Sequence, residues 1–176
     1  LPAGVSAASG MNAIAHCIEA LYAVDATSES TESALKGIEL LSRALPQIVA
    51  DPQAMPPREA ALEGAWCGGF ALGAVQMALH HKLCHTLGGA FNLPHAETHA
   101  VLLPYTAAYN RQAASGAMQL AAEALDSPDA PSALLDLERK IGTPLSLANI
   151  GMKESDLDRA ADLAVEREYP NPRPVT

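Results

Sequence analysis

The stretch "HHKLCHTLGGAFNLPH", from His80 to His95, holds four histidines, a cysteine and a lysine in an otherwise apolar part of the chain. His81 and His85 are four residues apart, so a helix carries both on one face. The Gly-Gly pair and the proline that follow are expected to break this helix before His95. The pattern therefore predicts a histidine-bearing helix, a break, and a further histidine beyond it.

The segments around this stretch also have helical spacing. Residues 9–22 place Ile14, Ile18 and Leu21 on one side of a helix, and residues 28–45 repeat apolar side chains at helical intervals. We find no segment with the alternating polar and apolar pattern of a strand. We therefore predict an all-α, multi-helix bundle-like domain that covers residues 1–176.

A long apolar run rich in small residues, residues 59–79, precedes the histidines and predicts a central helix that is buried on most sides. Its glycines lower helix stability, so we expect them to permit close approach of another helix or of a ligand. Pro46 and Pro104 are expected to end or kink their helices. Gly142 is expected to close the helix before it.

Composition excludes several classes of protein. The chain has 176 residues, 49% hydrophobic but only 4% aromatic, so its core must be aliphatic. A formal net charge of -9 argues against a nucleic-acid partner, and we find no apolar run long enough to span a membrane. Cys17, Cys67 and Cys84 form no CxxC pair, so we expect buried free thiols in a cytoplasmic protein.

The histidines form the strongest functional signal. His16 lies on a different predicted helix, with Asn12 one turn before it, and side chains from several helices can converge in a bundle core. We predict that His16, His81, His85 and His95 form a functional cluster. His80 and His99, taken singly, are expected to be core residues.

Spacing alone does not decide whether this cluster binds a metal. A divalent site usually includes a carboxylate or thiolate, and Asn12 stands where an aspartate would complete the set. Glu19 and Glu97 are expected to be solvated or structural carboxylates. The sequence "LGGAFN" follows a predicted helix rather than a strand, so it is a poor match to a phosphate-binding loop.

The segments "SGMNAIAHCIEALY" and "HHKLCHTLGGAFNLPHAETHAVLLPY" resemble the iron-containing (group III) alcohol dehydrogenase superfamily. Members have an N-terminal α/β domain that binds NADH or NADPH and a C-terminal all-helical catalytic domain. This chain resembles only the second domain, and it starts without methionine, so we expect it to begin inside a longer protein. The resemblance also implies a homodimer.

In the metal-dependent members an aspartate and three histidines hold the ion, and the matching positions here are Asn12, His16, His81 and His95. His85 matches a further histidine near the nicotinamide and the substrate. Asparagine at position 12 resembles a branch that is regarded as working without metal. That branch reduces a small dicarboxylate with an enone, in bacterial breakdown of aromatic compounds. If a metal does bind, iron or zinc on His16, His81 and His95 is the alternative.

The resemblance implies that His81 and His85 are the central pair, one as proton donor and one as partner of the oxyanion. His16 and His95 would complete the polar floor, while Asn12 and Lys82 would bind the substrate. Two other functions remain open: a metal-dependent alcohol or aldehyde reductase, and a helical binding module without catalysis. A helical metal-dependent phosphohydrolase is disfavoured because the sequence has no HD pair and no HExxH.

Overall fold

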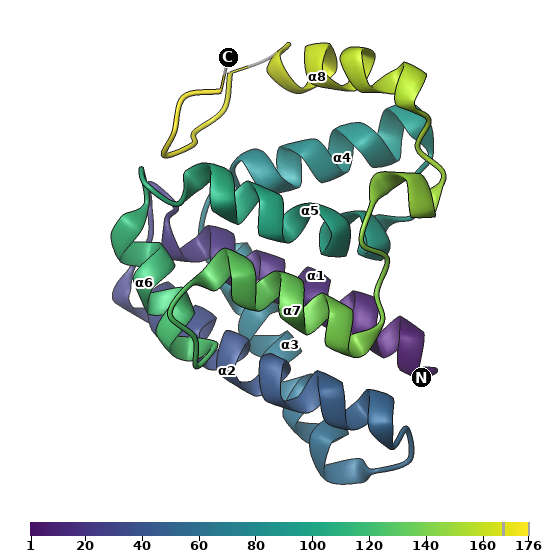
Figure 1. Cartoon of the computed structure of the whole chain (residues 1–176). Helices are drawn as coiled ribbons and strands as arrows, with labels where there is room; N and C mark the ends of the chain where they lie inside the picture. Colours follow the sequence, from purple (N-terminus) through teal and green to yellow (C-terminus); the bar gives the residue numbers. More distant parts are fainter. Residues whose placement is uncertain (167, 176) are drawn as a thin grey trace.

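The computed structural model describes residues 1–166 and 168–175, in which helices are the only regular elements. Figure 1 shows how they are stacked. The predicted all-α architecture is confirmed. The helices are α1 (Ala3–Leu21), α2 (Ser28–Ala50), α3 (Met55–Ala74), α4 (Leu79–Phe91), α5 (His95–Asn110), α6 (Ser115–Ala124), α7 (Ala130–Ile141), the short 3-10 turns η1 (Leu147–Ile150) and η2 (Glu154–Asp156), and α8 (Leu157–Val165).

The central helix of the domain is α1. It lies between the α2–α3 pair on one side and α5 on the other, with α7 alongside (Figure 1). Met11, Ile14 and Ile18 are completely buried, and α1 is rich in alanine, the best helix-forming residue. The core is therefore aliphatic, as the composition predicts, and α1 carries Asn12, His16 and Glu19 into its middle.

The prediction that residues 59–79 form the central, mostly buried helix is wrong. The helix in this region, α3, ends at Ala74 and buries only one side. Its other side exposes Leu62, Trp66 and Phe70, the last two with their rings 6.1 Å apart. An apolar run of this length does not by itself distinguish burial on all sides from an apolar helix with one face open.

Two glycines of α3 allow the close helix approach that the sequence predicts. A Cβ added at Gly64 would lie 2.8 Å from Cγ of Leu41 on α2, and one at Gly68 would lie 2.8 Å from the carbonyl oxygen of Ala13 on α1. At Gly69 an added Cβ would meet nothing within 4 Å among the described residues. Only the glycines that face α1 and α2 are therefore needed for packing.

The prolines and the Gly-Gly pair interrupt the helices less than predicted. Pro46 and Pro104 lie inside α2 and α5, which continue to Ala50 and Asn110. The predicted break before His95 is present, but it lies after the Gly-Gly pair, residues 88–89, because α4 continues to Phe91 and ends at Asn92 with φ 55°. Tertiary packing overrides these local preferences. The predicted end of α7 at Gly142 is confirmed, with φ 73°.

The C-terminal segment is irregular and lies against α5; Thr176 lies outside the described residues. The hydroxyl of Tyr109 donates to the carbonyl oxygen of Pro174 at 2.6 Å, and the amides of Asn110 and Asn171 exchange two hydrogen bonds. None of the described helices is long and apolar enough to cross a membrane. The three cysteines are free and buried, which confirms the prediction, and burial raises the pKa of Cys17 to about 12.

Candidate active site

All six histidines of the chain gather where α1, α4 and α5 meet. The ring centroids of His16 and His81 are 5.1 Å apart, and the His81 ring is 4.8 Å from that of His99. His95 continues the row, with its ring 4.4 Å from His99 and 6.2 Å from His85. The structure thus brings together the four histidines that the sequence selects, and it adds two more.

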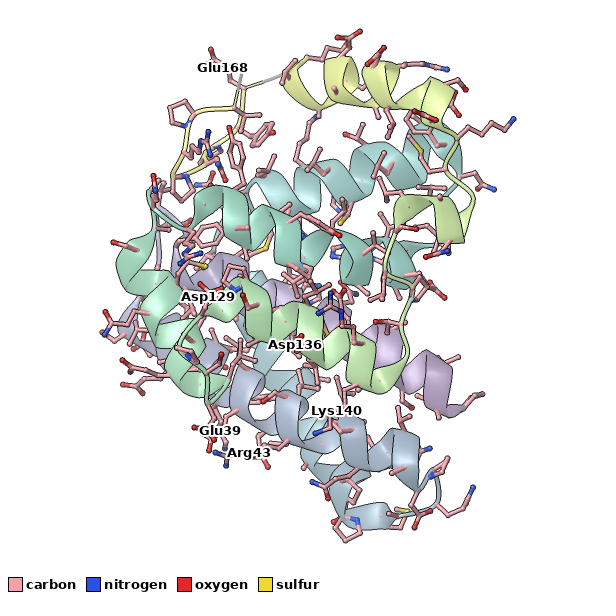
Figure 2. All side chains as sticks on the ribbon, viewed as in Figure 1. Glu39, Arg43, Asp129, Asp136, Lys140 and Glu168 are labelled. Atoms are coloured by element: carbon pink, nitrogen blue, oxygen red, sulfur yellow. The ribbon has the colours of Figure 1, made fainter. Side chains whose placement is uncertain are left out.

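The cluster runs from the core to the surface. His80, His81, His99 and Glu19 are buried, Asn12 and His16 are half-buried, and His85 and His95 are exposed. His95 therefore lies at the open edge rather than on the floor where it was expected, and His99 takes the floor position. Side chains occupy the space between the helices (Figure 2). A cavity of about 1410 Å³ along α5 and α6 contains none of these histidines.

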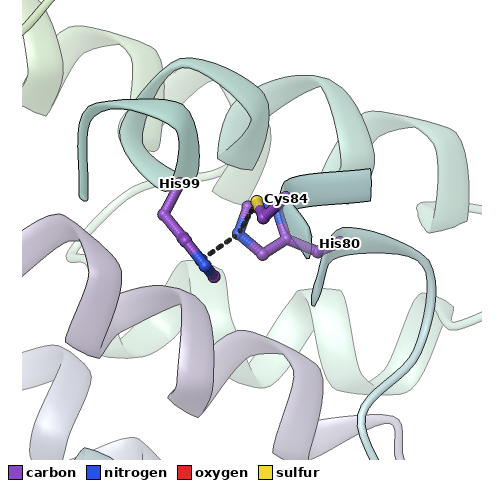
Figure 3. Close-up of side chains that lie close together, drawn as sticks. All are labelled: His80, Cys84 and His99. Carbon is purple, nitrogen blue, oxygen red and sulfur yellow. Dashed lines mark hydrogen bonds between the residues drawn. The ribbon is translucent and has the colours of Figure 1, made fainter. Parts of the chain in front are cut away.

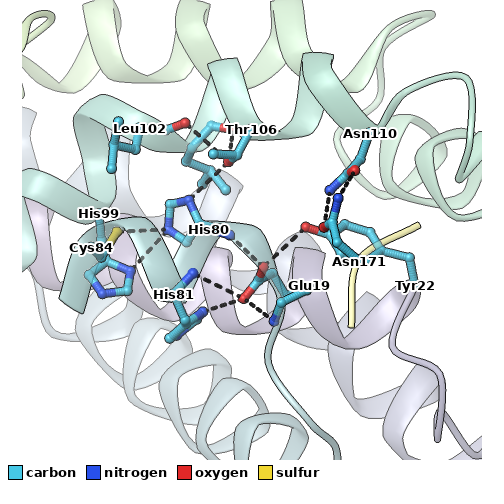
Figure 4. Close-up of polar contacts among 12 residues, drawn as sticks. Glu19, Tyr22, His80, His81, Cys84, His99, Leu102, Thr106, Asn110 and Asn171 are labelled. Atoms are coloured by element: carbon cyan, nitrogen blue, oxygen red, sulfur yellow. Dashed lines mark hydrogen bonds and ion pairs between the residues drawn. The ribbon is translucent and has the colours of Figure 1, made fainter. Parts of the chain in front are cut away.

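The floor of the site is organised by Glu19, whose side chain is fully buried. Its Oε1 accepts from the backbone N–H of His80 at 2.8 Å, and its Oε2 accepts from those of Ala78 at 3.2 Å and His81 at 3.3 Å. Its Oε2 also lies 2.5 Å from Nδ1 of His81, and the Tyr22 hydroxyl donates to Oε1 at 3.4 Å. Figure 4 shows these contacts converging on one carboxylate.

This arrangement makes Glu19 the cap of α4. The N-cap residue of α4 is Ala78, which has no side-chain acceptor, so a carboxylate from α1 takes the free N–H groups. Burial alone would raise the pKa of Glu19, but the hydrogen bond from His81 and the nearby His80 outweigh it and lower the pKa. Glu19 is therefore an ionised carboxylate, which can only accept, and Nδ1 of His81 must donate to it.

A second chain of contacts holds His80 and His99. The Thr106 hydroxyl donates to the carbonyl oxygen of Leu102 at 3.1 Å, so its oxygen accepts from Nδ1 of His80 at 2.9 Å. Nε2 of His80 then carries a lone pair and accepts from Nδ1 of His99 at 3.0 Å. The chain therefore fixes the tautomers of both rings.

Three polar atoms are left without partners at the centre of the site. Nε2 of His81, Nε2 of His99 and Oδ1 of Asn12 are buried and have no hydrogen-bond partner among the described residues. Since buried polar atoms are nearly always satisfied, such a group points to a ligand or to ordered water. The sequence alone did not single out His99 or Glu19, although Glu19 follows His16 by three residues and so lies on its helix face.

Four imidazoles of the site, those of His16, His80, His85 and His99, have lowered pKa values and are neutral at neutral pH. Burial, with the neighbouring His81 and His95, lowers the pKa of His16 to about 4. Burial lowers the pKa of His80 to about 3, and it also lowers the pKa values of His85 and His99. A ligand with negative charge would reverse these shifts, because it stabilises the protonated form of an imidazole.

The candidate donor set contains no charged ligand, although three imidazoles alone can hold zinc. Asn12, His16, His81 and His95 provide an amide and three imidazoles, with no carboxylate or thiolate among them. Within the described residues, the compact group of potential ligand atoms is instead His80, Cys84 and His99 (Figure 3). That group is occupied internally, since Nε2 of His80 and Nδ1 of His99 bond to each other. Burial also raises the pKa of the Cys84 thiol.

Comparison with known proteins places this geometry in a family. Residues 6–176 match the C-terminal part of the Fe-containing alcohol dehydrogenase family. The chain is 51% identical to maleylacetate reductase from Pseudomonas sp. (strain P51) over 99% of its length. It superposes on maleylacetate reductase from Rhizobium sp. strain MTP-10005 with a TM-score of 0.97 at 49% identity, covering 100% of this chain and 50% of that one.

A more distant structure has the same fold. The iron-containing alcohol dehydrogenase from Corynebacterium glutamicum superposes with a TM-score of 0.95 at 41% identity, covering 100% of this chain and 50% of that one. The chain spans about half the length of the curated relatives it matches, 50% for the Pseudomonas protein.

Proposed function

Because the chain belongs to the Fe-containing alcohol dehydrogenase family, we propose that it is the C-terminal catalytic half of an NAD(P)H-dependent maleylacetate reductase. The observation that carries this proposal is the histidine cluster with Asn12 in the place of an acidic ligand. Relatives named maleylacetate reductase, at 51% identity over 99% of the chain, support the substrate. The N-terminal half would bind the nucleotide. We also propose that the protein lies in the cytoplasm and forms a homodimer.

The reaction would convert maleylacetate to 3-oxoadipate in the breakdown of aromatic compounds. NADH or NADPH, held by the other half of the protein, would supply the hydride for the β-carbon of the enone, and the ketone oxygen would take up the negative charge as an enolate. The protein must then stabilise that oxygen and deliver one proton to the α-carbon. Imidazoles suit both tasks because their unperturbed pKa lies near neutral pH.

The proposed roles follow from how deeply each histidine is buried and from which of its ring nitrogens is already bonded. Nε2 of His81 is free to carry the proton because Nδ1 is held by Glu19. His85, at the exposed edge, would contact the enolate oxygen or exchange protons with solvent. His16 and His95 would line the space between them, and the amide of Asn12 would bind the substrate.

Charge supports a dicarboxylate as the substrate. Asn12 adds no negative charge to the site, and Lys82, on the same helix as His81, would attract a carboxylate. Binding of a dianion would favour protonation of the neutral imidazoles and so load the site with the proton that the reaction needs. We therefore propose that the reaction proceeds without a metal ion; if iron or zinc does bind, His16, His81 and His95 would hold it.

The test follows oxidation of NADH and NADPH by the full-length protein with maleylacetate, before and after exhaustive chelation. We expect turnover that chelation does not change. Loss of turnover that iron or zinc restores would instead establish a metal-dependent reductase of the same family. Absence of any redox activity with the nucleotide-binding half attached would contradict the proposal and favour a binding module.

A further inference from the structure

We propose that Glu19 is a positioning residue for the reaction: its buried carboxylate holds the Nδ1 proton of His81 and so makes Nε2 the atom that exchanges a proton with the substrate. The proposal rests on the function above for the identity of the substrate. The contact between Glu19 and His81 does not depend on that function, because it is a property of the fold.

The first step of the argument is the shape of the contact. Oε2 of Glu19 lies 2.5 Å from Nδ1 of His81, and the two side chains are 0% and 6% exposed. Water does not compete for a pair buried this deeply. A carboxylate that binds one ring nitrogen fixes the tautomer and the orientation of the ring, and catalytic and metal-binding histidines commonly depend on such a partner.

The second step is that Glu19 is itself held rigidly. Backbone N–H groups of Ala78, His80 and His81 all donate to it, so its position is set by the start of α4. The same helix turn carries His81. The carboxylate and the imidazole are therefore fixed to one another twice, through the side chain and through the backbone.

The third step is the direction of the free nitrogen. Nε2 of His81 is buried and has no hydrogen-bond partner in the described part of the chain. The ring of His81 lies 5.1 Å from that of His16 and 6.0 Å from that of His85, between the half-buried and exposed members of the cluster. Nε2 is thus the one nitrogen of this ring that is left to meet a ligand.

The experiment compares Glu19→Ala, Glu19→Gln and the matched control Glu138→Gln in the full-length enzyme. Glu138 is also fully buried, but it lies on α7 and its carboxylate has no hydrogen-bond partner among the described residues. We expect Glu19→Ala to lower kcat at least roughly tenfold per folded molecule, with a smaller change in KM. Glu19→Gln, whose amide oxygen still accepts from Nδ1, should recover part of kcat, and Glu138→Gln should leave kcat unchanged.

A direct readout is nitrogen NMR of protein labelled with 15N-histidine, with His81 assigned from the signals lost in His81→Gln. The proposal requires that Nδ1 of His81 is protonated in the unmodified protein, and an unprotonated Nδ1 would overturn it even if no variant folds. Unchanged kcat in folded Glu19→Ala would also overturn it, since a purely structural cap would lower stability only. If the enzyme fails to reduce maleylacetate while Nδ1 is protonated, the proposed function fails and the positioning contact stands.

Discussion

Nδ1 of His99 lies 3.0 Å from Nε2 of His80, and this hydrogen bond links Thr106, which binds the other nitrogen of His80, to the floor of the candidate site. The Thr106 oxygen accepts a hydrogen bond from Nδ1 of His80, which leaves Nε2 of His80 as the acceptor for His99. Nε2 of His99 in turn carries no proton, and it is buried without a hydrogen-bond partner among the described residues. The Thr106 hydroxyl on α5 thus determines which nitrogen of His99 donates a hydrogen bond and which one is left to accept.

Thr106→Val tests this chain. The substitution keeps the shape of the side chain but leaves Nδ1 of His80 buried without an acceptor, which costs about 1–3 kcal/mol. We expect lower stability in urea unfolding and heterogeneous His80 and His99 signals in 15N spectra. Thr98→Val is the matched control, because the Thr98 hydroxyl donates only to the carbonyl oxygen of Pro94. An equal loss of stability in both variants would contradict a special role for Thr106.

His85→Ala and His81→Ala test the proposed catalytic pair. His85 is exposed, so its removal should leave the fold intact while turnover with maleylacetate falls at least roughly tenfold. His81→Ala should lower turnover as strongly and also destabilise the protein, because it removes the ring that donates to Glu19. The rate of NAD(P)H oxidation is the measurement, with circular dichroism as the check on folding. Near-normal rates in either variant would remove that residue from the mechanism.

Much of this site could be predicted from the sequence, because helical spacing places side chains reliably. His81 and His85 share a face of α4, and Asn12 and His16 share a face of α1, as their four-residue spacing requires. What spacing does not give is the angle at which separate helices meet. The position of His95 at the edge rather than on the floor depends on that angle.

Glu19 shows a second limit of prediction from the sequence, which is the burial of a single charged residue. A glutamate in a helix is most often solvated, so its residue type predicts a surface position. Its burial follows from the start of α4 lying over it, where three N–H groups stabilise the charge. The mistaken prediction of a buried central helix has a related cause, since the exposed Trp66 and Phe70 are apolar residues that the fold leaves uncovered.

Asn12→Asp tests the proposal that the missing carboxylate at position 12 keeps the site free of metal. The variant adds a carboxylate one turn before His16, where Oδ1 of Asn12 is now buried without a described partner. We expect the variant to retain about one equivalent of zinc or iron after dialysis, measured by elemental analysis, while the unmodified protein retains little. Turnover should fall as well, since the new charge repels a dicarboxylate. Tight metal binding by the unmodified protein would contradict the assignment of a metal-free site.

Gly68→Ala and Gly69→Ala form a matched pair on α3. At Gly68 a new Cβ would lie 2.8 Å from the carbonyl oxygen of Ala13, so α3 must move away from α1, at a cost of about 1–3 kcal/mol. At Gly69 the Cβ meets nothing within 4 Å among the described residues, so alanine should stabilise the helix by about 0.5–1 kcal/mol. Thermal unfolding of both variants gives the comparison. Equal effects of the two substitutions on stability would show that the contact between α3 and α1 at Gly68 has room for a Cβ.

Glu138→Gln tests the energetic effect of the second buried carboxylate. Burial raises the pKa of Glu138 from 4.5 to about 8, so the folded protein keeps this proton at pH values where the unfolded chain has lost it. The contribution to stability is therefore complete below pH 4.5. It declines by about 1.4 kcal/mol per pH unit as the pH rises toward 8 and levels off above that.

Glutamine cannot ionise, so the stability of Glu138→Gln relative to the unmodified protein should increase steadily between pH 5 and pH 8. Urea unfolding at pH 5, 6.5 and 8 measures this difference. Glu59→Gln, at an exposed position on α3, is the control and should shift stability little at any of the three pH values. Parallel pH profiles for Glu138→Gln and the unmodified protein would mean that Glu138 keeps an ordinary pKa in the folded chain, and that water reaches its carboxylate.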